Sequence, residues 1–366
     1  MKTLLTTVAM TIALAVLAPP VFADSGEIDC HRPENVKYKN AEKKRYQDML
    51  AHNKAGRAKQ AYDIASRLDS RCISNNDKEI QRIEADQAAV LKKSSLQLGQ
   101  QAENKGRYTE AYKYYEYYHG SDADRVQWKL AKSKPGNLGS VQTGVYYLRN
   151  KRKYLSEAAA RNTKTGDIDS ARLAAMNHFT SKDDVDAMDP NRNARIKAID
   201  GYLGELKAIA TKQGEKYLAD EDKIFRARKT SLAAKGDTFT ELNRARDWFS
   251  LFGQEKHVKD RAVKRGDTLL ADDSRKSLEL AITYFGYADH PEKLVQKAKD
   301  KAHRLGDAHL KKGEKEIAVE YYHIAGLDDK ASKLEEAHEA ETAKAEAKRQ
   351  GQFKQEQKSL EKELGL

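Results

Sequence analysis

Proline is scarce in this chain, which leaves long stretches without helix breakers. Only six of the 366 residues are proline, and four of them, Pro33, Pro135, Pro190 and Pro291, follow residue 23. The stretches between them are rich in Ala, Lys, Glu, Leu and Gln, which favour helix. Alternating β-branched segments, which are typical of strands, are absent. The sequence therefore predicts an all-α protein.

Long apolar runs are absent after the first 23 residues, so we expect no transmembrane segment in the mature chain. Residues 1–23 have the pattern of a signal peptide, with Lys2 at the start, an apolar run over 4–18, and Val21 and Ala23 before Asp24. The run is shorter than the roughly 20 residues of a bilayer-spanning helix. We predict cleavage after Ala23 and export to the periplasm. An uncleaved anchor, or secretion from the cell, is the alternative.

Cysteine is nearly absent: the chain contains only Cys30 and Cys72. In an oxidising compartment such a pair usually forms a disulfide, so we predict one between these residues. Two unpaired buried thiols are the alternative. No Cys-x-x-Cys occurs, so the sequence indicates neither a redox nor a metal function for the pair.

Charged residues make up 34% of the chain, against 39% hydrophobic residues. A solenoid reconciles this balance with a folded protein, because its thin core lies along a large surface. The formal net charge is +11, and loss of Lys2 with the leader lowers it to about +10. Such a charge favours contact with acidic proteins, lipid headgroups or anionic polymers. For an exported protein we expect no nucleic-acid partner.

One residue spacing recurs along the chain: a glycine, an alanine five residues later, and an aromatic or small residue four further on. It is clearest at Gly106–Ala111–Tyr115 and at Gly313–Ala318–Tyr322. Looser copies occur at Gly56–Ala61–Ala65, Gly166–Ala171–Ala175 and Gly214–Ala219, and weaker units at Ala245–Phe249–Phe252 and Ala281–Phe285–Ala288. Recurrence on this scale predicts a stack of similar helix pairs rather than one globular core.

The two clearest copies resemble tetratricopeptide repeats. In each, a Leu-Gly pair (Leu98-Gly99 and Leu305-Gly306) precedes the turn glycine by seven residues, and the alanine and aromatic follow it. The resemblance implies a right-handed superhelical solenoid of antiparallel helix pairs whose concave face holds a segment of a partner protein. The interval from Ala245 to Ala281 is 36 residues, near the family's period of about 34, whereas the upstream intervals are longer.

Breakers and composition suggest a division of the mature chain. We predict helical repeats over 24–133, a linker or hinge over 134–144 at the Lys134-Pro135-Gly136 cluster, and further repeats over 145–334. From 335 to 352 no apolar residue is larger than alanine, so 335–366 is predicted to be a charged helical arm. A frayed tail is the alternative.

A basic and aromatic stretch between Arg125 and Ser156, which lacks Asp and Glu, is the candidate binding surface. Its cations would contact acidic groups, and its aromatic rings would stack on sugars. The alternative is a solvated basic face with its aromatics turned into the core. The candidate residues are Arg125, Trp128, Lys129, Tyr146, Tyr147, Arg149, Lys151, Arg152 and Lys153.

Catalytic signatures are missing from the sequence. No Gly-x-Ser-x-Gly, His-Glu-x-x-His, phosphate-binding loop or dinucleotide fingerprint occurs, and the ten histidines show no metal-ligand spacing. The acidic run from Asp183 to Asp189 fails as a calcium loop, because Met188 and Arg195 stand where oxygen ligands belong. We therefore predict no enzyme activity, no cofactor and no metal.

Two functional hypotheses follow from these patterns. The first is a periplasmic scaffold or adaptor that binds other envelope proteins along its curved surface. The second is a binding protein for an anionic envelope polymer, such as peptidoglycan, lipopolysaccharide or an acidic polysaccharide, which would use the stretch from Arg125 to Lys153.

Overall fold

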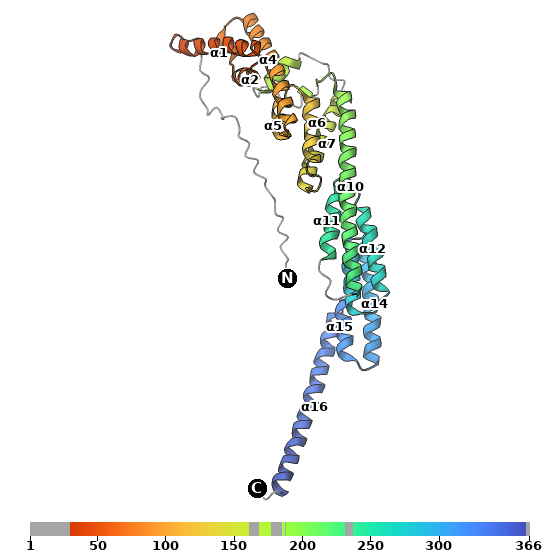
Figure 1. The fold of residues 1–366 in the computed structure, drawn as a ribbon. Coiled ribbons are helices and arrows are strands. Elements are labelled where there is room, and N and C mark those ends of the chain that lie inside the picture. The colour runs from red at the N-terminus through yellow and green to blue at the C-terminus, as the bar shows by residue number, and fades with distance from the viewer. Residues whose placement is uncertain (1–29, 161–167, 177–184, 187, 231–236, 364–366) are drawn as a thin grey trace. The chain divides into compact units, whose positions relative to one another are not determined.

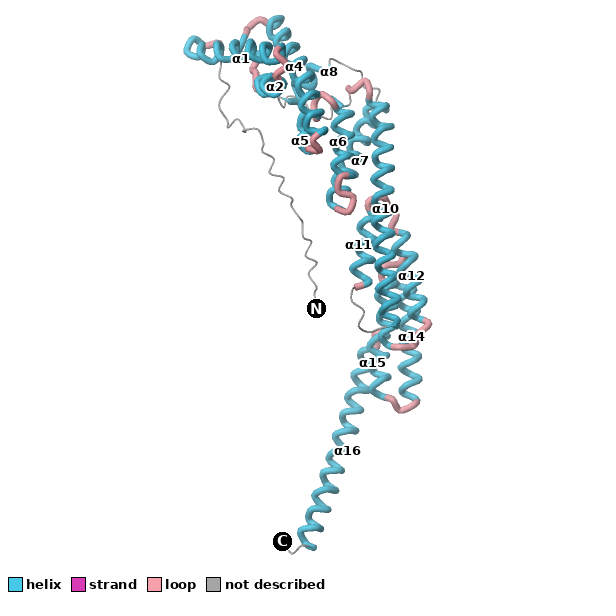
Figure 2. Tube along the Cα trace, viewed as in Figure 1, coloured by secondary structure: helices cyan, strands magenta, loops and turns pink. Residues whose placement is uncertain are grey.

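The computed structural model describes residues 30–160, 168–176, 185–186, 188–230 and 237–363. Within these residues every regular element is a helix and none is a strand, which confirms the all-α prediction (Figure 1, Figure 2). None of the described helices combines the length and the apolar character needed to cross a bilayer. The predicted signal peptide, residues 1–23, lies outside the described residues.

The chain divides into two compact units, and each is considered by itself. The first comprises the described residues of Met1–Ser133 and Tyr146–Leu203, and the second comprises Lys134–Val145 and the described residues of Gly204–Leu366. Helices α7 and α10 each contribute residues to both units. This division differs from the one predicted by composition, because it follows contacts rather than position along the chain.

The first unit packs consecutive helices against one another around a core that includes Met49, Leu91 and Tyr118. Helix α4 packs against both α5 and α2. Its elements are η1 (Pro33–Asn35), α1 (Val36–Lys54), α2 (Ala58–Ala65), α3 (Ser70–Ile73), α4 (Asp77–Asn104), α5 (Tyr108–Tyr115), α6 (Gly120–Lys132), the later part of α7 (Leu138–Ala160), α8 (Ile168–Met176) and the start of α10 (Arg192–Thr230).

The second unit repeats the pairing of neighbours, with α12 against α13 and α14 against α15. Its core includes Leu242, Leu278 and Phe285, all fully buried. Its elements are the rest of α10, α11 (Thr238–Ser250), α12 (Lys256–Leu270), α13 (Arg275–Phe285), α14 (Pro291–Lys311), α15 (Lys315–Ala325) and α16 (Asp328–Glu363).

Polar side chains set where several helices begin. Asn76 accepts hydrogen bonds from the backbone N–H groups of Lys78 and Glu79 at the start of α4. Asp237 does the same for α11, and Ser274 accepts from the N–H of Ser277 in α13. Such caps satisfy backbone donors that have no partner inside the helix.

Each of four helix pairs seats an aromatic ring on a glycine of the facing helix. A Cβ atom added at Gly99 or Gly306 would lie less than 3.0 Å from a ring carbon of Tyr115 or Tyr322, respectively. Both tyrosines are fully buried, as are Ala111 and Ala318 one turn earlier. The structure therefore gives the Leu-Gly pairs a packing role, since any side chain in place of the glycine would displace the ring.

Two further copies of this contact do not follow the same residue spacing. Gly266 meets the ring of Phe285, and Gly214 meets that of Phe249, again at less than 3.0 Å from an added Cβ. The glycine and the ring are 16 residues apart in the clear copies, but 19 and 35 apart here. The interpretation of Gly214 as a turn glycine is wrong, because it lies inside α10.

The turn glycines of the two clear copies and of the first looser copy have the expected backbone. Gly56, Gly106 and Gly313 have φ of 72°, 70° and 82°, the left-handed conformation that ends a helix at little cost for glycine. Gly166, the turn glycine of another looser copy, lies outside the described residues.

The breaker cluster is shorter than the predicted linker over 134–144. Helix α7 begins at Leu138, and the side chain of Asn137 accepts a hydrogen bond from the backbone N–H of Ser140 at 2.9 Å. Asn137 therefore starts a new helix, and the loop covers only the few residues before it.

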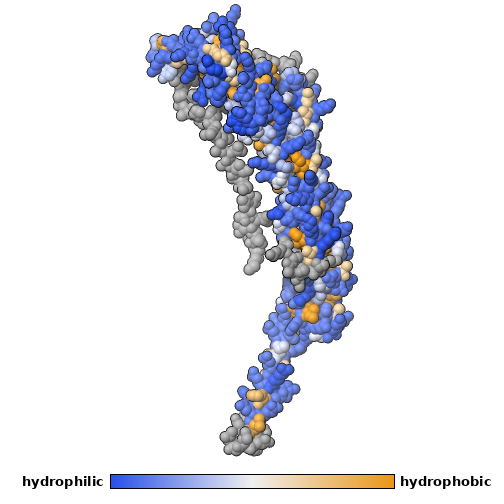
Figure 3. Space-filling view, in the orientation of Figure 1, coloured by the Kyte–Doolittle hydropathy of each residue, from blue (hydrophilic) through white to orange (hydrophobic). Residues whose placement is uncertain are grey.

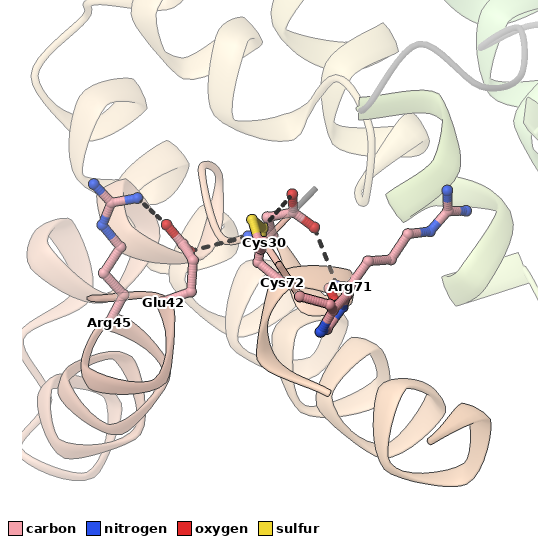
Figure 4. Close-up of a disulfide and its surroundings, with 7 residues drawn as sticks. Cys30, Glu42, Arg45, Arg71 and Cys72 are labelled. Atoms are coloured by element: carbon pink, nitrogen blue, oxygen red, sulfur yellow. Dashed lines mark hydrogen bonds and ion pairs between the residues drawn. A yellow bond between two sulfur atoms is a disulfide. The ribbon is translucent and has the colours of Figure 1, made fainter. Parts of the chain in front are cut away.

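The predicted disulfide joins Cys30 and Cys72, with 5.1 Å between their Cα atoms (Figure 4). It ties the start of the described chain to α3. Close to it, the side chain of Glu42 on α1 forms an ion pair with Arg45 and accepts a hydrogen bond from the backbone N–H of Asp69 at 3.2 Å. The bridge and these contacts hold α1 and α3 together.

The charged C-terminal segment forms one helix, α16, which starts at Asp328, before the predicted boundary at 335. Its first turns pack on α15 through buried Ala331 and half-buried Leu334. Every described side chain from Glu339 to Leu360 is exposed. Figure 1 shows this part extending past α15.

We expect Gly214→Ala to lower the free energy of unfolding of the second unit by about 1–3 kcal/mol, because the new methyl group displaces the Phe249 ring. Gly204→Ala in the same helix is the matched control. No atom lies within 4 Å of a Cβ added there, so the control should stabilise α10 by about 0.5–1 kcal/mol. Urea unfolding followed by Trp248 fluorescence, in a Trp128→Phe background, measures both. Equal effects of the two substitutions would contradict the packing role.

Candidate functional site

Much of the predicted basic surface is neutralised by acidic residues from elsewhere in the chain. Arg125 forms ion pairs with Glu103 at 2.8 Å and with Asp122 at 2.7 Å. Lys129 pairs with the other oxygen of Glu103 at 2.8 Å. Glu103 lies on α4 and is largely buried, so these two cations hold α6 against α4. A ligand that binds Arg125 or Lys129 would have to compete with these ion pairs.

Lys151 is not a surface residue, contrary to the prediction. It is buried, forms an ion pair with Asp186, and lies 6.0 Å from the ring centre of Tyr147. The neighbouring Arg152 is half-exposed and forms an ion pair with Asp200 on α10. The sequence stretch lacks acids, but the fold supplies them from other helices.

The aromatic residues of the stretch divide into packed and exposed ones. Trp128 stacks on Tyr202 of α10, with ring centres 4.9 Å apart, and the ammonium of Lys132 lies 4.6 Å from the Trp128 ring. The hydroxyl of Tyr147 donates a hydrogen bond to Asp124 at 3.3 Å. Tyr146, by contrast, is 70% exposed.

A narrower exposed face lies on α7. Tyr146, Arg149 and Lys153 are spaced by three and four residues, which places them on one side of the helix. All three are exposed, and Tyr154 beside them is 43% exposed. Lys153 contacts Glu157 only at 3.9 Å. We name Tyr146, Arg149, Lys153 and Tyr154 the α7 face.

A buried ionic network lies behind the α7 face in the first unit. Its centre is Arg195, which is 3% exposed and binds Asp124 at 2.9 Å, Asp186 at 2.7 Å and Asp189 at 2.9 Å. The guanidinium also lies directly on Gly120, where a Cβ would meet it at 2.6 Å. With Lys151 on Asp186, the network joins α6, α7 and the start of α10.

Burial and charge act in opposite directions on these carboxylates. Burial raises the pKa of Asp124 above its usual value, although Arg195 opposes the shift. Burial also acts to raise the pKa of Asp186, but the charges of Arg195 and Lys151 outweigh it, so this pKa lies below the usual value. Burial raises the pKa of Tyr147 well above its usual value, which keeps its hydroxyl as the donor to Asp124.

The central role of Arg195 is not evident from the sequence, although the acidic run and the arginine stand close together in it. The acidic run fails as a calcium loop partly because Arg195 stands at a ligand position, and it is this arginine that binds Asp186 and Asp189. Asp183 and Asp184 lie outside the described residues. An arginine shortly after an acidic run was the available signal.

The second unit has a related network around Glu221 of α10, which is fully buried. Arg265 donates to both carboxylate oxygens of Glu221 at 3.1 and 3.3 Å, and the Tyr284 hydroxyl donates to one at 2.9 Å. The guanidinium of Arg265 lies 4.0 Å from the ring centre of Phe225. Every group here has an internal partner, so the network acts in packing.

Two shallow hollows lie on the outer faces of α12 and α14. The hollow on α12, of about 580 Å³, is lined by Asp260, Val263, Lys264, Asp267 and Thr268. The hollow on α14, of about 600 Å³, is lined by Glu292, Lys293, Gln296, Lys297, Asp300 and Arg304. Lys297 and Asp267 link the two helices at 3.2 Å. We name these lining residues the α12/α14 face.

The α12/α14 face carries both signs of charge, and Val263 is the only apolar residue that lines its hollows. In the described part of the chain no three His, Cys, Asp or Glu residues form a group that could hold a metal ion. The arrangement suits recognition of a charged segment better than binding of a small apolar molecule.

No protein-family model, curated protein or solved structure shows a significant match to this chain.

We expect Arg195→Met to lower the free energy of unfolding of the first unit by about 3–5 kcal/mol at pH 7, because three buried carboxylates lose their common partner. Arg152→Met, which removes an exposed pair, should cost less than about 1 kcal/mol. Trp128 fluorescence in a Trp248→Phe background reports unfolding of this unit.

The cost of Arg195→Met should shrink between pH 7 and pH 5. Without Arg195 the folded-state pKa values of the carboxylates rise, so the folded variant binds more protons than the unfolded one and gains stability as the pH falls. In the native chain Asp186 has a lowered pKa, and its stabilisation is lost as the pH falls. A cost that does not depend on pH would contradict the ionic role of the network.

Proposed function

We propose that this chain is an exported adaptor of the cell envelope that binds other envelope proteins. It is a right-handed superhelical solenoid of tetratricopeptide-like pairs and holds partner segments on the exposed sides of the first helices of its pairs. Export rests on the leader pattern of residues 1–23, and the Cys30–Cys72 disulfide is consistent with an oxidising compartment.

The observation that carries the proposal is the α12/α14 face. In the pairs that begin with α12 and α14, the second helix packs its ring onto the glycine of the first, and another side of the first helix stays open. On α12 and α14 this open side bears hollows lined mainly by charged residues. Neighbouring first helices joined by the Lys297–Asp267 pair offer a continuous surface for an extended segment.

The chemistry of this face indicates the kind of segment that it would bind. Lys264, Lys293 and Arg304 can pair with acidic side chains, and Asp260 and Asp300 with basic ones. Binding through exposed charges is screened by salt, so the complex should weaken as the ionic strength rises. A partner segment of mixed charge fits this face.

Photo-cross-linking from single positions tests the adaptor proposal. A photoreactive residue at Lys264 or Lys297 should label the same envelope protein, and one at Lys276, exposed on the second helix α13, should not. Lys264→Glu/Lys297→Glu should lower capture of that protein at least tenfold, whereas Lys276→Glu should leave it unchanged. Equal labelling from all three positions, or none from the first two, counts against the proposal.

A second candidate function, binding of an anionic envelope polymer, is favoured by the α7 face alone. An exposed tyrosine and two exposed cations on one side of a helix suit a glycan that carries acid groups. Six predicted members of that surface are bound to other helices or packed against them: Arg125, Trp128, Lys129, Tyr147, Lys151 and Arg152.

We expect Arg149→Glu/Lys153→Glu to lower binding to peptidoglycan sacculi, lipopolysaccharide or alginate at least tenfold at low salt, because attraction becomes repulsion. Lys43→Glu/Lys44→Glu, which changes the net charge equally on exposed α1, is the control. Co-sedimentation or retention over a range of salt measures the effect. If both variants lose binding equally, the effect comes from the net charge of the protein, and the α7 face is excluded as the binding site.

A further inference from the structure

The outer segment of α16, residues 339–363, has little within the second unit to pack against. Lys315 on α15 forms an ion pair with Glu341, and beyond it every described side chain is exposed. Phe353 and Leu360 are 65% and 56% exposed. Figure 3 shows this segment as mostly hydrophilic, with hydrophobic residues near its outer end. Two large apolar residues on an otherwise polar helix indicate a contact.

The outer segment continues the face by which α16 docks on its own unit. On the side of α16 that faces α15 and α14, Ala331 is buried, and Leu334 and His338 are partly buried. At 100° per residue, a stripe about 100° wide runs on from them along the helix. Its positions in the outer segment are Thr342, Ala345, Arg349, Gln352, Phe353, Glu356, Leu360 and Glu363.

We propose that the outer segments of α16 from two copies of this chain pair antiparallel through this stripe. In an antiparallel pair centred between Gln352 and Phe353, each stripe residue has a defined partner in the other copy. Arg349 meets Glu356, Ala345 meets Leu360, and the two Phe353 rings meet near the centre. The proposal stands on α16 and does not depend on the adaptor function.

Charge and size both fit this arrangement. The pair of Arg349 with Glu356 forms twice, and a small alanine stands opposite each leucine, so the helices can stay close. A parallel pair would place Arg349 on Arg349 and Glu356 on Glu356, which is repulsive. Within one helix these two residues are seven positions, or about 10.5 Å, apart, too far for a direct ion pair.

The docked part of α16 does not compete with the proposed pairing. Leu334, which packs on α15 within its own unit, would lie beyond residue 363 of the other copy in this register. Each copy therefore keeps its internal contacts, and only the exposed outer segment becomes buried.

Sedimentation equilibrium of the full chain tests the pairing. We expect a monomer–dimer equilibrium that Phe353→Glu shifts at least tenfold toward monomer. Ala347→Glu, at a position that is also exposed but lies on the opposite side of α16, should not shift it. Far-UV circular dichroism checks that both variants keep their helix content. A chain that is monomeric from micromolar to millimolar concentration, or a dimer unaffected by Phe353→Glu, overturns the proposal.

Charge reversal separates pairing between copies from effects within one helix. Arg349→Glu and Glu356→Arg should each weaken the dimer at least tenfold, and the double variant should restore it, because the ion pairs re-form between copies with exchanged signs. Absence of rescue overturns the proposed register. This result is independent of the α12/α14 face, whose variants leave α16 unchanged.

Cysteine cross-linking tests the direction of the helices. Both native cysteines are in the disulfide, so an introduced cysteine is the only free thiol. A mixture of Ala345→Cys and Leu360→Cys chains should oxidise to the 345–360 heterodimer. Homodimers linked 345–345 and 360–360 would instead show a parallel pair and overturn the antiparallel arrangement.

Discussion

The fold depends on one close contact, in which an aromatic ring of one helix lies on a glycine of the helix it packs against. At Gly99, Gly214, Gly266 and Gly306 the ring occupies the volume that a Cβ atom would need. Two helices can then approach closely and bury a large side chain with a small number of residues. Because few residues are needed to bury each ring, a chain with 34% charged residues can still form a core.

Buried ion networks complete the packing where apolar residues are few. Leucine precedes the glycine in two pairs, at Leu98 and Leu305, but in the α12 pair Arg265 takes that place and binds the buried Glu221. In the first unit, Arg195 likewise binds a buried carboxylate, that of Asp186. A buried ion pair adds little net stability, but loss of one partner leaves a buried charge with neither a counter-charge nor water to stabilise it. Such networks therefore restrict which helices can pack together.

Charge along the sequence does not translate into charge on the surface. The stretch from Arg125 to Ser156 has no acid of its own, yet Glu103, Asp186 and Asp200 neutralise Lys129, Lys151 and Arg152 across the helix stack. Two exposed cations of the stretch lie on the α7 face. In the second unit a charged surface forms although the local sequence does not suggest one. The helices of the α12/α14 face have no unusual composition, and the face arises where two first helices lie side by side.

The sequence by itself determined the helical class, the turn glycines, the disulfide and the two regular helix pairs, because these depend on local conformation, on a single possible cysteine pairing, or on a fixed spacing. It also indicated the charged C-terminal helix, although not where that helix begins. Only the tertiary structure decided that Gly214 and Gly266 pair with Phe249 and Phe285, and that Arg195 gathers three aspartates. Asp186 and Asp189 lie close to Arg195 in the sequence, but Asp124 is 71 residues away, and the glycine–ring contacts cross loops of differing length. Burial and partnership across such separations are properties of the packed helices, and no local pattern encodes them.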